Sequence, residues 1–178
     1  MRALRLLGMV TVFALVSTLQ PAQAQSVSIK AEVLKDWTDL KATMDKLAAE
    51  MPDDKYTAKP TPPQQSFGER IVHIATVNAG VLGSLGGKAA KPTIDAKATT
   101  KAAAIKAMDD SFDYGIALIN EQTDQTMLAA TPMPPRFLGP STHARIFTFL
   151  MGHTWDIYGQ LVVYLRLNGH VPPASQRP

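Results

Sequence analysis

The sequence contains no cysteine, and this absence removes several kinds of chemistry at once. Disulfides, thiolate nucleophiles, sulfur-ligated zinc and lipid attachment through an N-terminal cysteine all need that residue. Aromatic residues are also few, at 7% of the 178 residues, and neither sign of charge dominates. The folded protein must therefore be held together by its hydrophobic core alone.

Several sequence motifs with known chemistry are missing as well. There is no Gly-x-Ser-x-Gly nucleophile motif, no phosphate-binding loop and no dinucleotide fingerprint, and the glycines of residues 80–87 follow no expected strand. The basic residues do not gather into a stripe, because those from Lys88 to Lys106 are interleaved with alanines and threonines. We therefore expect no nucleic-acid partner.

The N-terminus is typical of a cleaved secretion signal. Arg2 and Arg5 precede an apolar run over residues 6–16, and Ala22-Gln23-Ala24 offers the small residues that signal peptidase accepts. This run is shorter than the roughly 20 residues needed to span a bilayer. We expect residues 1–24 to be removed, the product to be periplasmic or secreted, and no membrane contact to remain. Without the two arginines, 16 basic residues face 15 acidic ones, which gives a net charge of +1.

Residues 25–178 show four apolar stripes at helical spacing. The first predicts a helix over about residues 28–51, with its members at Val33, Trp37, Leu40, Met44, Leu47 and Met51. A capping box at Ser66-Phe67-Gly68-Glu69 predicts the start of a second helix, which ends before Gly86-Gly87. Further stripes predict helices over about residues 97–127 and 142–168. With no alternating strand pattern, the sequence predicts an all-α fold, a single-domain four-helix bundle over residues 25–178.

Histidines are the remaining candidates for chemistry, and two of the four lie on expected apolar helix faces. His73 lies on the second helix and His153 on the last, where Asp156 follows three residues later on nearly the same side. A buried imidazole needs partners for its nitrogens, and either a neighbouring polar group or a divalent metal ion can supply them. His73, His153 and Asp156 together would suit zinc with water at an open position. By spacing alone, the neighbouring polar group is the commoner arrangement.

The other polar and aromatic residues have structural interpretations. His143 and His170 lie at helix ends, where we expect exposed side chains. Trp37 and Trp155 are expected in the core, together with Met44, Met108 and Met151. An acidic cluster at Asp109, Asp110 and Asp113 is expected to be a solvated helix face.

Motifs spread over the whole chain after the signal resemble the DinB-like superfamily. They are Tyr56-Thr57-Ala58-Lys59-Pro60, Ser66-Phe67-Gly68-Glu69, His73-Ile74-Ala75, His153, Tyr158-Gly159-Gln160, and Tyr164-Leu165-Arg166-Leu167-Asn168-Gly169 followed by Pro172-Pro173. The resemblance implies a four-helix bundle in which three histidines bind a divalent metal ion, one from the second helix and an HxxxH pair from the last. Members with assigned activity include thiol-dependent transferases and isomerases. The resemblance is also compatible with a homodimer that pairs through helix faces.

Carried onto this sequence, the resemblance assigns His73 and His153 as ligands but places Ile157 at the third position. An isoleucine cannot coordinate a metal ion, so the three-histidine site is incomplete, and Asp156 is the candidate replacement. Two functions stay open. One is an exported, divalent-metal-dependent enzyme that uses zinc or nickel on a small-molecule ligand. The other is a non-catalytic binding or structural module that has lost the metal, and metal content after purification without chelators distinguishes the two.

Overall fold

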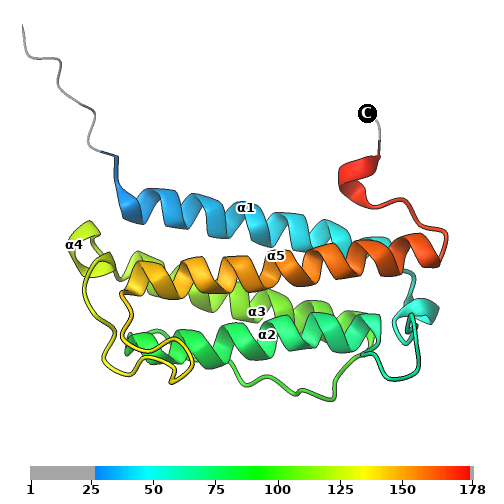
Figure 1. Ribbon diagram of the computed structural model, residues 1–178, viewed down its shortest axis with the longest axis horizontal. Helices are drawn as coiled ribbons and strands as arrows, with labels where there is room; N and C mark the ends of the chain where they lie inside the picture. The colour runs from blue at the N-terminus through cyan, green and yellow to red at the C-terminus, as the bar shows by residue number, and fades with distance from the viewer. Residues whose placement is uncertain (1–26, 177–178) are drawn as a thin grey trace, which may run out of the picture.

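Four long helices account for most of the computed structural model, which describes residues 27–176 (Figure 1). A single helical turn and three 3₁₀ turns complete the regular structure, so the elements in chain order are α1 (Ile29–Glu50), η1 (Asp53–Lys55), α2 (Phe67–Leu82), η2 (Gly83–Leu85), α3 (Lys101–Asn120), α4 (Asp124–Met127), α5 (His143–Leu167) and η3 (Pro173–Ser175). The expected all-α four-helix bundle is confirmed. The signal-peptide prediction for residues 1–24 lies outside the described residues.

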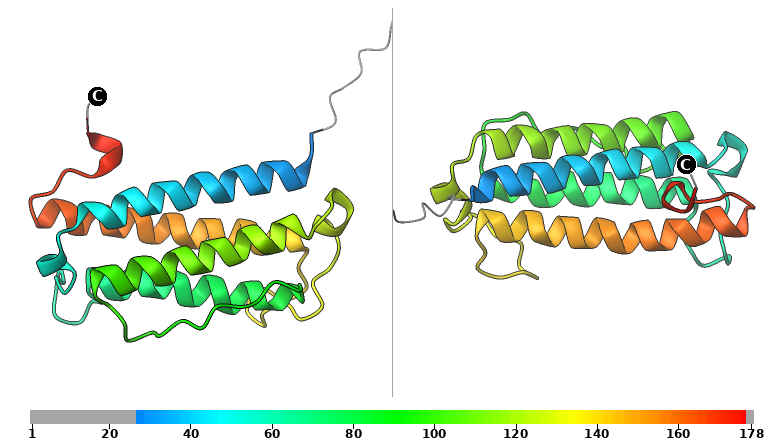
Figure 2. Two further views of the ribbon diagram at one scale, coloured as in Figure 1. Left: turned by 180° about the vertical axis from the view of Figure 1, so that it is seen from behind. Right: turned by 90° about the horizontal axis from the view of Figure 1, so that it is seen from above.

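Each long helix packs against two of the others, as the views from behind and above show (Figure 2). Helix α1 contacts α3 and α5, and α2 contacts the same two helices from the opposite side. Below, the α1–α3 seam means the contact surface around Trp37, and the α2–α5 seam means the contact surface around His73 and His153. None of the helices within residues 27–176 is long and apolar enough to cross a membrane.

Local capping interactions set the ends of the helices where the sequence predicts them. The Ser66 hydroxyl accepts a hydrogen bond from the Glu69 backbone N–H at 3.2 Å, and the Glu69 carboxylate accepts one from the Ser66 backbone N–H, so the capping box is confirmed. The Thr142 hydroxyl caps α5 by accepting from the Arg145 backbone N–H. After α5, Gly169 adopts the left-handed conformation with φ of +80°, which favours glycine.

The third helix is shorter than the predicted span of residues 97–127. It begins after Thr100 and ends at Asn120. The next residue, Glu121, turns its carboxylate to the loop after α2, where it accepts hydrogen bonds from the backbone N–H groups of Lys88 and Ala89 at 2.8 and 2.7 Å. The chain then restarts as α4. This break depends on a contact between residues more than thirty positions apart, so the apolar stripe alone does not reveal it.

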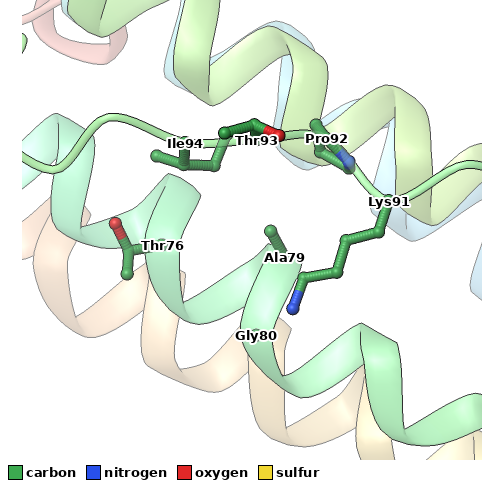
Figure 3. A pocket seen from close by; sticks show the side chains of 7 residues that line it. All are labelled: Thr76, Ala79, Gly80, Lys91, Pro92, Thr93 and Ile94. Carbon is green, nitrogen blue, oxygen red and sulfur yellow. The ribbon is translucent and has the colours of Figure 1, made fainter.

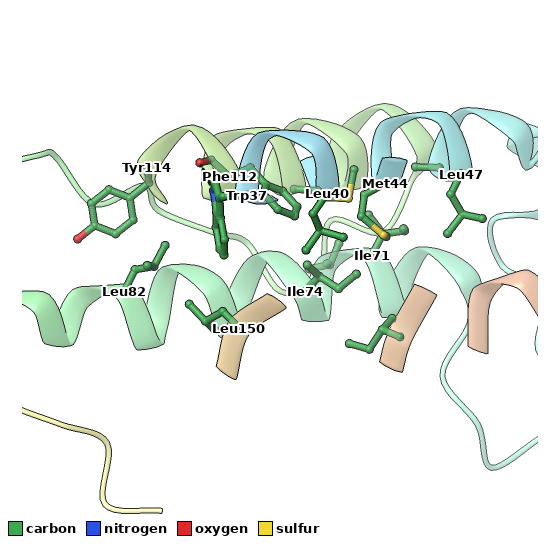
Figure 4. Packing of buried hydrophobic residues seen from close by; sticks show 14 of the residues in the cluster. Trp37, Leu40, Met44, Leu47, Ile71, Ile74, Leu82, Phe112, Tyr114 and Leu150 are labelled. Carbon is green, nitrogen blue, oxygen red and sulfur yellow. Dashed lines mark hydrogen bonds between the residues drawn. The ribbon is translucent and has the colours of Figure 1, made fainter. Parts of the chain in front are cut away.

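Aromatic side chains of the core gather around Trp37, where α1, α3 and α5 meet (Figure 4). Trp37 is fully buried, with its ring centroid 5.0 Å from that of Phe112 and 5.4 Å from that of Phe147. Its Nε1–H donates a hydrogen bond to the Phe112 carbonyl at 2.9 Å. Gly115 makes room for the indole, because a Cβ at that position would lie 2.6 Å from the Trp37 ring. The prediction that Trp37 is a core residue is confirmed.

The second tryptophan corrects the sequence-based prediction. Trp155 is 48% exposed and packs edge-to-face on Tyr158, with ring centroids 5.2 Å apart. Its neighbours Thr154 and Ile157 are the residues that face the core. At about 100° per residue, position 155 is turned by roughly 160° from position 157, towards solvent.

Candidate metal centre at the α2–α5 seam

The structure brings together the two histidines that the sequence singled out. His73 lies in the second turn of α2, and His153 lies near the middle of α5. Their Nε2 atoms are 3.3 Å apart and their ring centroids are 5.2 Å apart. At this distance the two nitrogens can share one proton, since one imidazole donates and the other accepts. Residues 80 positions apart in the sequence therefore form one polar pair at the seam.

The pair borders an aromatic and aliphatic environment. Phe149 stacks on His153 with ring centroids 6.3 Å apart, and Phe137 in turn packs on Phe149 at 5.4 Å. Ile157 is only 1% exposed and belongs to the core. The Nδ1 atom of His153 is buried and has no hydrogen-bond partner among residues 27–176. Such an orphaned ring nitrogen costs free energy.

The third candidate residue, Asp156, is not gathered into the same cluster. Its side chain is exposed, and its Oδ2 accepts a hydrogen bond from the Gln160 side-chain amide at 2.9 Å. Around the helix axis, position 156 is turned about 60° from position 153 in one direction, and the buried position 157 is turned about 40° in the other. Asp156 therefore points away from the core. Within residues 27–176, no group of three or more histidine or acidic side chains is arranged to hold a metal ion.

Arg70 is a residue of this site that sequence reasoning missed. It lies three residues before His73 on α2, and its Nε is buried without a hydrogen-bond partner in the described chain. Burial lowers the pKa of His73, and the charge of Arg70 lowers it further. Burial is also the main cause that lowers the pKa of His153, followed by His73 and opposed by Asp156. The i, i+3 spacing of Arg70 and His73 was the available signal, because such residues share a helix face.

The distance between the histidines provides a test of whether the site fits a metal ion. Two nitrogens bound to one tetrahedral zinc ion at about 2.0–2.1 Å lie about 3.3–3.4 Å apart. The Nε2 atoms of His73 and His153 are separated by 3.3 Å, so these two residues fit such an ion without moving apart. A third protein ligand is missing from the described site. The spacing of the two histidines therefore matches that of two zinc-bound nitrogens, and the described residues supply no third ligand.

His143 corrects another expectation, because it is buried and not exposed. Only 9% of the residue is accessible, and its Nδ1 lies 2.9 Å from the Gln122 side-chain oxygen. Burial lowers the pKa of His143. The residue does lie at the start of α5, as predicted, but the chain just before α4 folds against that helix end. His143 therefore has a structural partner and takes no part in the pair formed by His73 and His153.

Fold and site together define a class: a four-helix bundle with histidines facing each other from its second and last long helices. The model of the DinB superfamily matches residues 36–161, which is well over half of the chain. The protein belongs to the DinB superfamily. The resemblance drawn from its sequence motifs is thereby confirmed.

Two solved structures show the same fold. A DinB-like protein from Bacillus cereus ATCC 10987 is 19% identical, with a TM-score of 0.60 over 82% of this chain and 96% of its own. A DinB-like protein from Bacillus subtilis, YjoA, is also 19% identical, with a TM-score of 0.59 over 82% of this chain and 99% of its own. A comparison with curated proteins gives no match. At this level of identity, the likeness concerns the fold.

Proposed function

We propose that this chain is an exported member of the DinB superfamily that binds a divalent metal ion through His73 and His153. With only two protein ligands, the ion would keep at least two positions for water or for donor atoms of a small molecule. The observation that carries the proposal is the 3.3 Å distance between the two Nε2 atoms. A metal held in this way would act as a Lewis acid towards the bound molecule.

The environment of the pair sets the expected strength of binding. Arg70 brings a positive charge close enough to affect both imidazoles, and this charge opposes a cation. A histidine that binds a metal ion usually donates its other ring N–H to an acceptor, which orients the ring. The Nδ1 atom of His153 has no such acceptor in the described chain. We therefore expect zinc or nickel to bind with micromolar affinity and not as a permanently resident ion.

Thermal unfolding with added metal tests this proposal. An ion that binds only the folded state stabilises it by about 2.7 kcal/mol at a hundredfold excess over its dissociation constant, so zinc should raise Tm. His73→Ala should abolish the increase. If the Asp156 carboxylate changes its rotamer and becomes the third ligand, Asp156→Ala should also abolish the increase in Tm. Asp36→Ala removes an exposed aspartate on α1 and is the control.

Ile157→His completes the experiment, because it restores a histidine four residues after His153 on the inward side of α5. We expect this variant to bind zinc much more tightly than the wild-type protein. If the variant responds to zinc and the wild-type protein does not, the natural site no longer binds metal. If neither responds, the two imidazoles do not face each other in solution.

A second function is favoured by the position of Ile157 itself. The side chain is 1% exposed and packed in the core, so α5 carries a well-buried apolar residue at the position where the resemblance implies a third histidine. Together with the positive charge of Arg70, this packing suits a bundle that serves as a non-catalytic binding or structural module. The metal titration separates the two functions, since a module without metal shows no zinc-dependent change in Tm.

Export belongs to the proposal and has its own measurement. Cleavage after Ala24 predicts a mature protein that begins at Gln25. Intact mass and N-terminal sequencing of the protein from the periplasm should show this end. Recovery of a chain that retains Arg2 and Arg5 would contradict export by a cleaved signal.

A further inference from the structure

Two adjoining hollows lie against α2, between this helix and the loops of residues 86–100 and 128–142. The first has a volume of about 420 Å³ and is lined by the residues drawn in Figure 3, among them Thr76 and Ile94. The second has a volume of about 540 Å³ and includes Ser84, Met133 and Phe137. Gly80 and Lys91 line both, so the two are treated together as the Lys91 hollow.

The floor of the Lys91 hollow is open at Gly80, where α2 carries no side chain. A Cβ added at Gly80 would meet no atom within 4 Å. A glycine inside a helix costs about 0.5–1 kcal/mol relative to alanine, so this open floor is obtained at the expense of stability. Figure 3 shows the Lys91 side chain extending from its loop towards α2. Its amine lies 3.6 Å from where a Cβ of Gly83 would be.

The lining of the hollow combines one positive charge with apolar surface. Lys91 forms no ion pair with any acid in the described chain, and neither hollow has an acidic residue in its lining. Ser84 is 9% exposed, and its hydroxyl has no hydrogen-bond partner within residues 27–176. Met133 and Phe137 are 66% and 68% exposed, which leaves apolar side chains uncovered at the edge of the hollow. An occupant that matches these features has an anionic head and an apolar body.

We propose that the Lys91 hollow binds a small organic carboxylate with an aromatic or branched apolar body. The carboxylate pairs with the Lys91 amine, while the apolar body covers Met133 and Phe137. Phe137 packs on Phe149, which stacks on His153, so two aromatic rings separate the bound molecule from the histidine pair. This site needs no metal ion and is independent of the function proposed above.

Titrations followed by NMR in metal-free buffer test this site with phenylacetate and its neutral analogue phenylacetamide. Phenylacetate should shift the backbone amides of Gly80, Gly83 and Lys91. One exposed ion pair contributes up to about 1 kcal/mol, so the acid should bind up to about fivefold more tightly than the amide. Phenylphosphonate identifies the preferred head group: tighter binding of this probe at the same amides assigns a phosphate-like head and still supports an anion site at Lys91.

Three variants make the test specific to the hollow. Lys91→Gln should reduce phenylacetate binding to the level of phenylacetamide. Lys97→Gln removes an exposed lysine of the same loop that lines neither hollow, and should leave both affinities unchanged. Phe137→Ala should weaken both probes by a similar factor. Equal binding of the two probes to the wild-type protein, or an equal effect of Lys91→Gln and Lys97→Gln, would overturn the proposal.

Discussion

The α1–α3 seam and the α2–α5 seam differ in how their buried side-chain nitrogens are paired. In the α1–α3 seam, the indole N–H of Trp37 is paired with a backbone carbonyl, and the Lys41 amine lies 2.8 Å from the Asp109 carboxylate. In the α2–α5 seam, Arg70 and His153 each keep a buried nitrogen without a partner in the described chain. Buried polar atoms cost stability unless they are satisfied. The paired nitrogens of the first seam therefore contribute to stability, whereas the unpaired nitrogens of the second reduce it.

The largest effect should come from removing the centre of the α1–α3 seam. Trp37→Ala deletes a fully buried indole and should lower the free energy of unfolding by about 3–5 kcal/mol. Trp155→Ala is the matched control, because that side chain is 48% exposed, and it should cost less than about 1 kcal/mol. Urea unfolding followed by circular dichroism measures both. Equal losses for the two variants would contradict the assignment of the core to the first seam.

The next largest effect should come from overpacking the same seam. Gly115→Ala places a Cβ 2.6 Å from the Trp37 ring and should destabilise the protein by about 1–3 kcal/mol, because a ring enclosed by Phe112 and Phe147 cannot move away freely. Gly152→Ala on α5 meets no atom within 4 Å and should instead stabilise by about 0.5–1 kcal/mol through helix propensity. Chemical unfolding should therefore give a lower midpoint for Gly115→Ala and a higher midpoint for Gly152→Ala than for the wild-type protein.

These residues also show how far sequence reasoning reached. The stripe through Trp37 and the capping box at Ser66 are local patterns, and they predicted the helices and the buried face of α1 correctly. Trp155, the break at Glu121 and the burial of His143 depend on contacts between distant segments, which local patterns do not encode.

For the candidate site, sequence reasoning predicted which residues would meet but not their surroundings. His73 and His153 were selected because each lies on an apolar helix face, and the structure places their Nε2 atoms 3.3 Å apart. The outward position of Asp156 follows from helix geometry once the core-facing side of α5 is known. The Lys91 hollow is formed by two irregular loops, for which the sequence carries no periodic signal.

The histidine pair itself gives the sharpest test of the α2–α5 seam. His73 and His153 hydrogen-bond to each other through their Nε2 atoms. Replacing both residues with leucine removes the two atoms together, so no Nε2 atom is left unpaired. We expect the double variant His73→Leu/His153→Leu to be as stable as the wild-type protein or more stable by about 1 kcal/mol in metal-free buffer. Chemical unfolding measures this difference. A loss above about 1 kcal/mol would mean that the pair is retained to hold the helices together.

The smallest effect concerns Asp45, whose carboxyl lies at the rim of the α1–α3 seam. Asp45 has a buried Oδ1 without a partner in the described chain. Burial raises the pKa of its carboxyl to about 6, with a further contribution from Asp109 and an opposing one from Lys41. The folded protein therefore holds this proton more tightly than the unfolded chain does, so stability falls as the pH rises from about 4 and the full cost of the ionised carboxylate is present above pH 6.

Asp45→Asn removes this cost, since the amide stays neutral at every pH. The variant should be more stable than the wild-type protein at pH 7.5, by about 1 kcal/mol or less because Asp45 is partly exposed and its charge is screened by solvent. The advantage should shrink as the pH falls through 6 and vanish near pH 4, where the wild-type carboxyl is also protonated when the chain unfolds. Unfolding midpoints across this range measure the difference, with Asp36→Asn, an exposed site on the same helix, as the control. A constant difference between Asp45→Asn and the wild-type protein from pH 7.5 to 4 would show that the charge of Asp45 costs nothing and that this rim is as well satisfied as the rest of its seam.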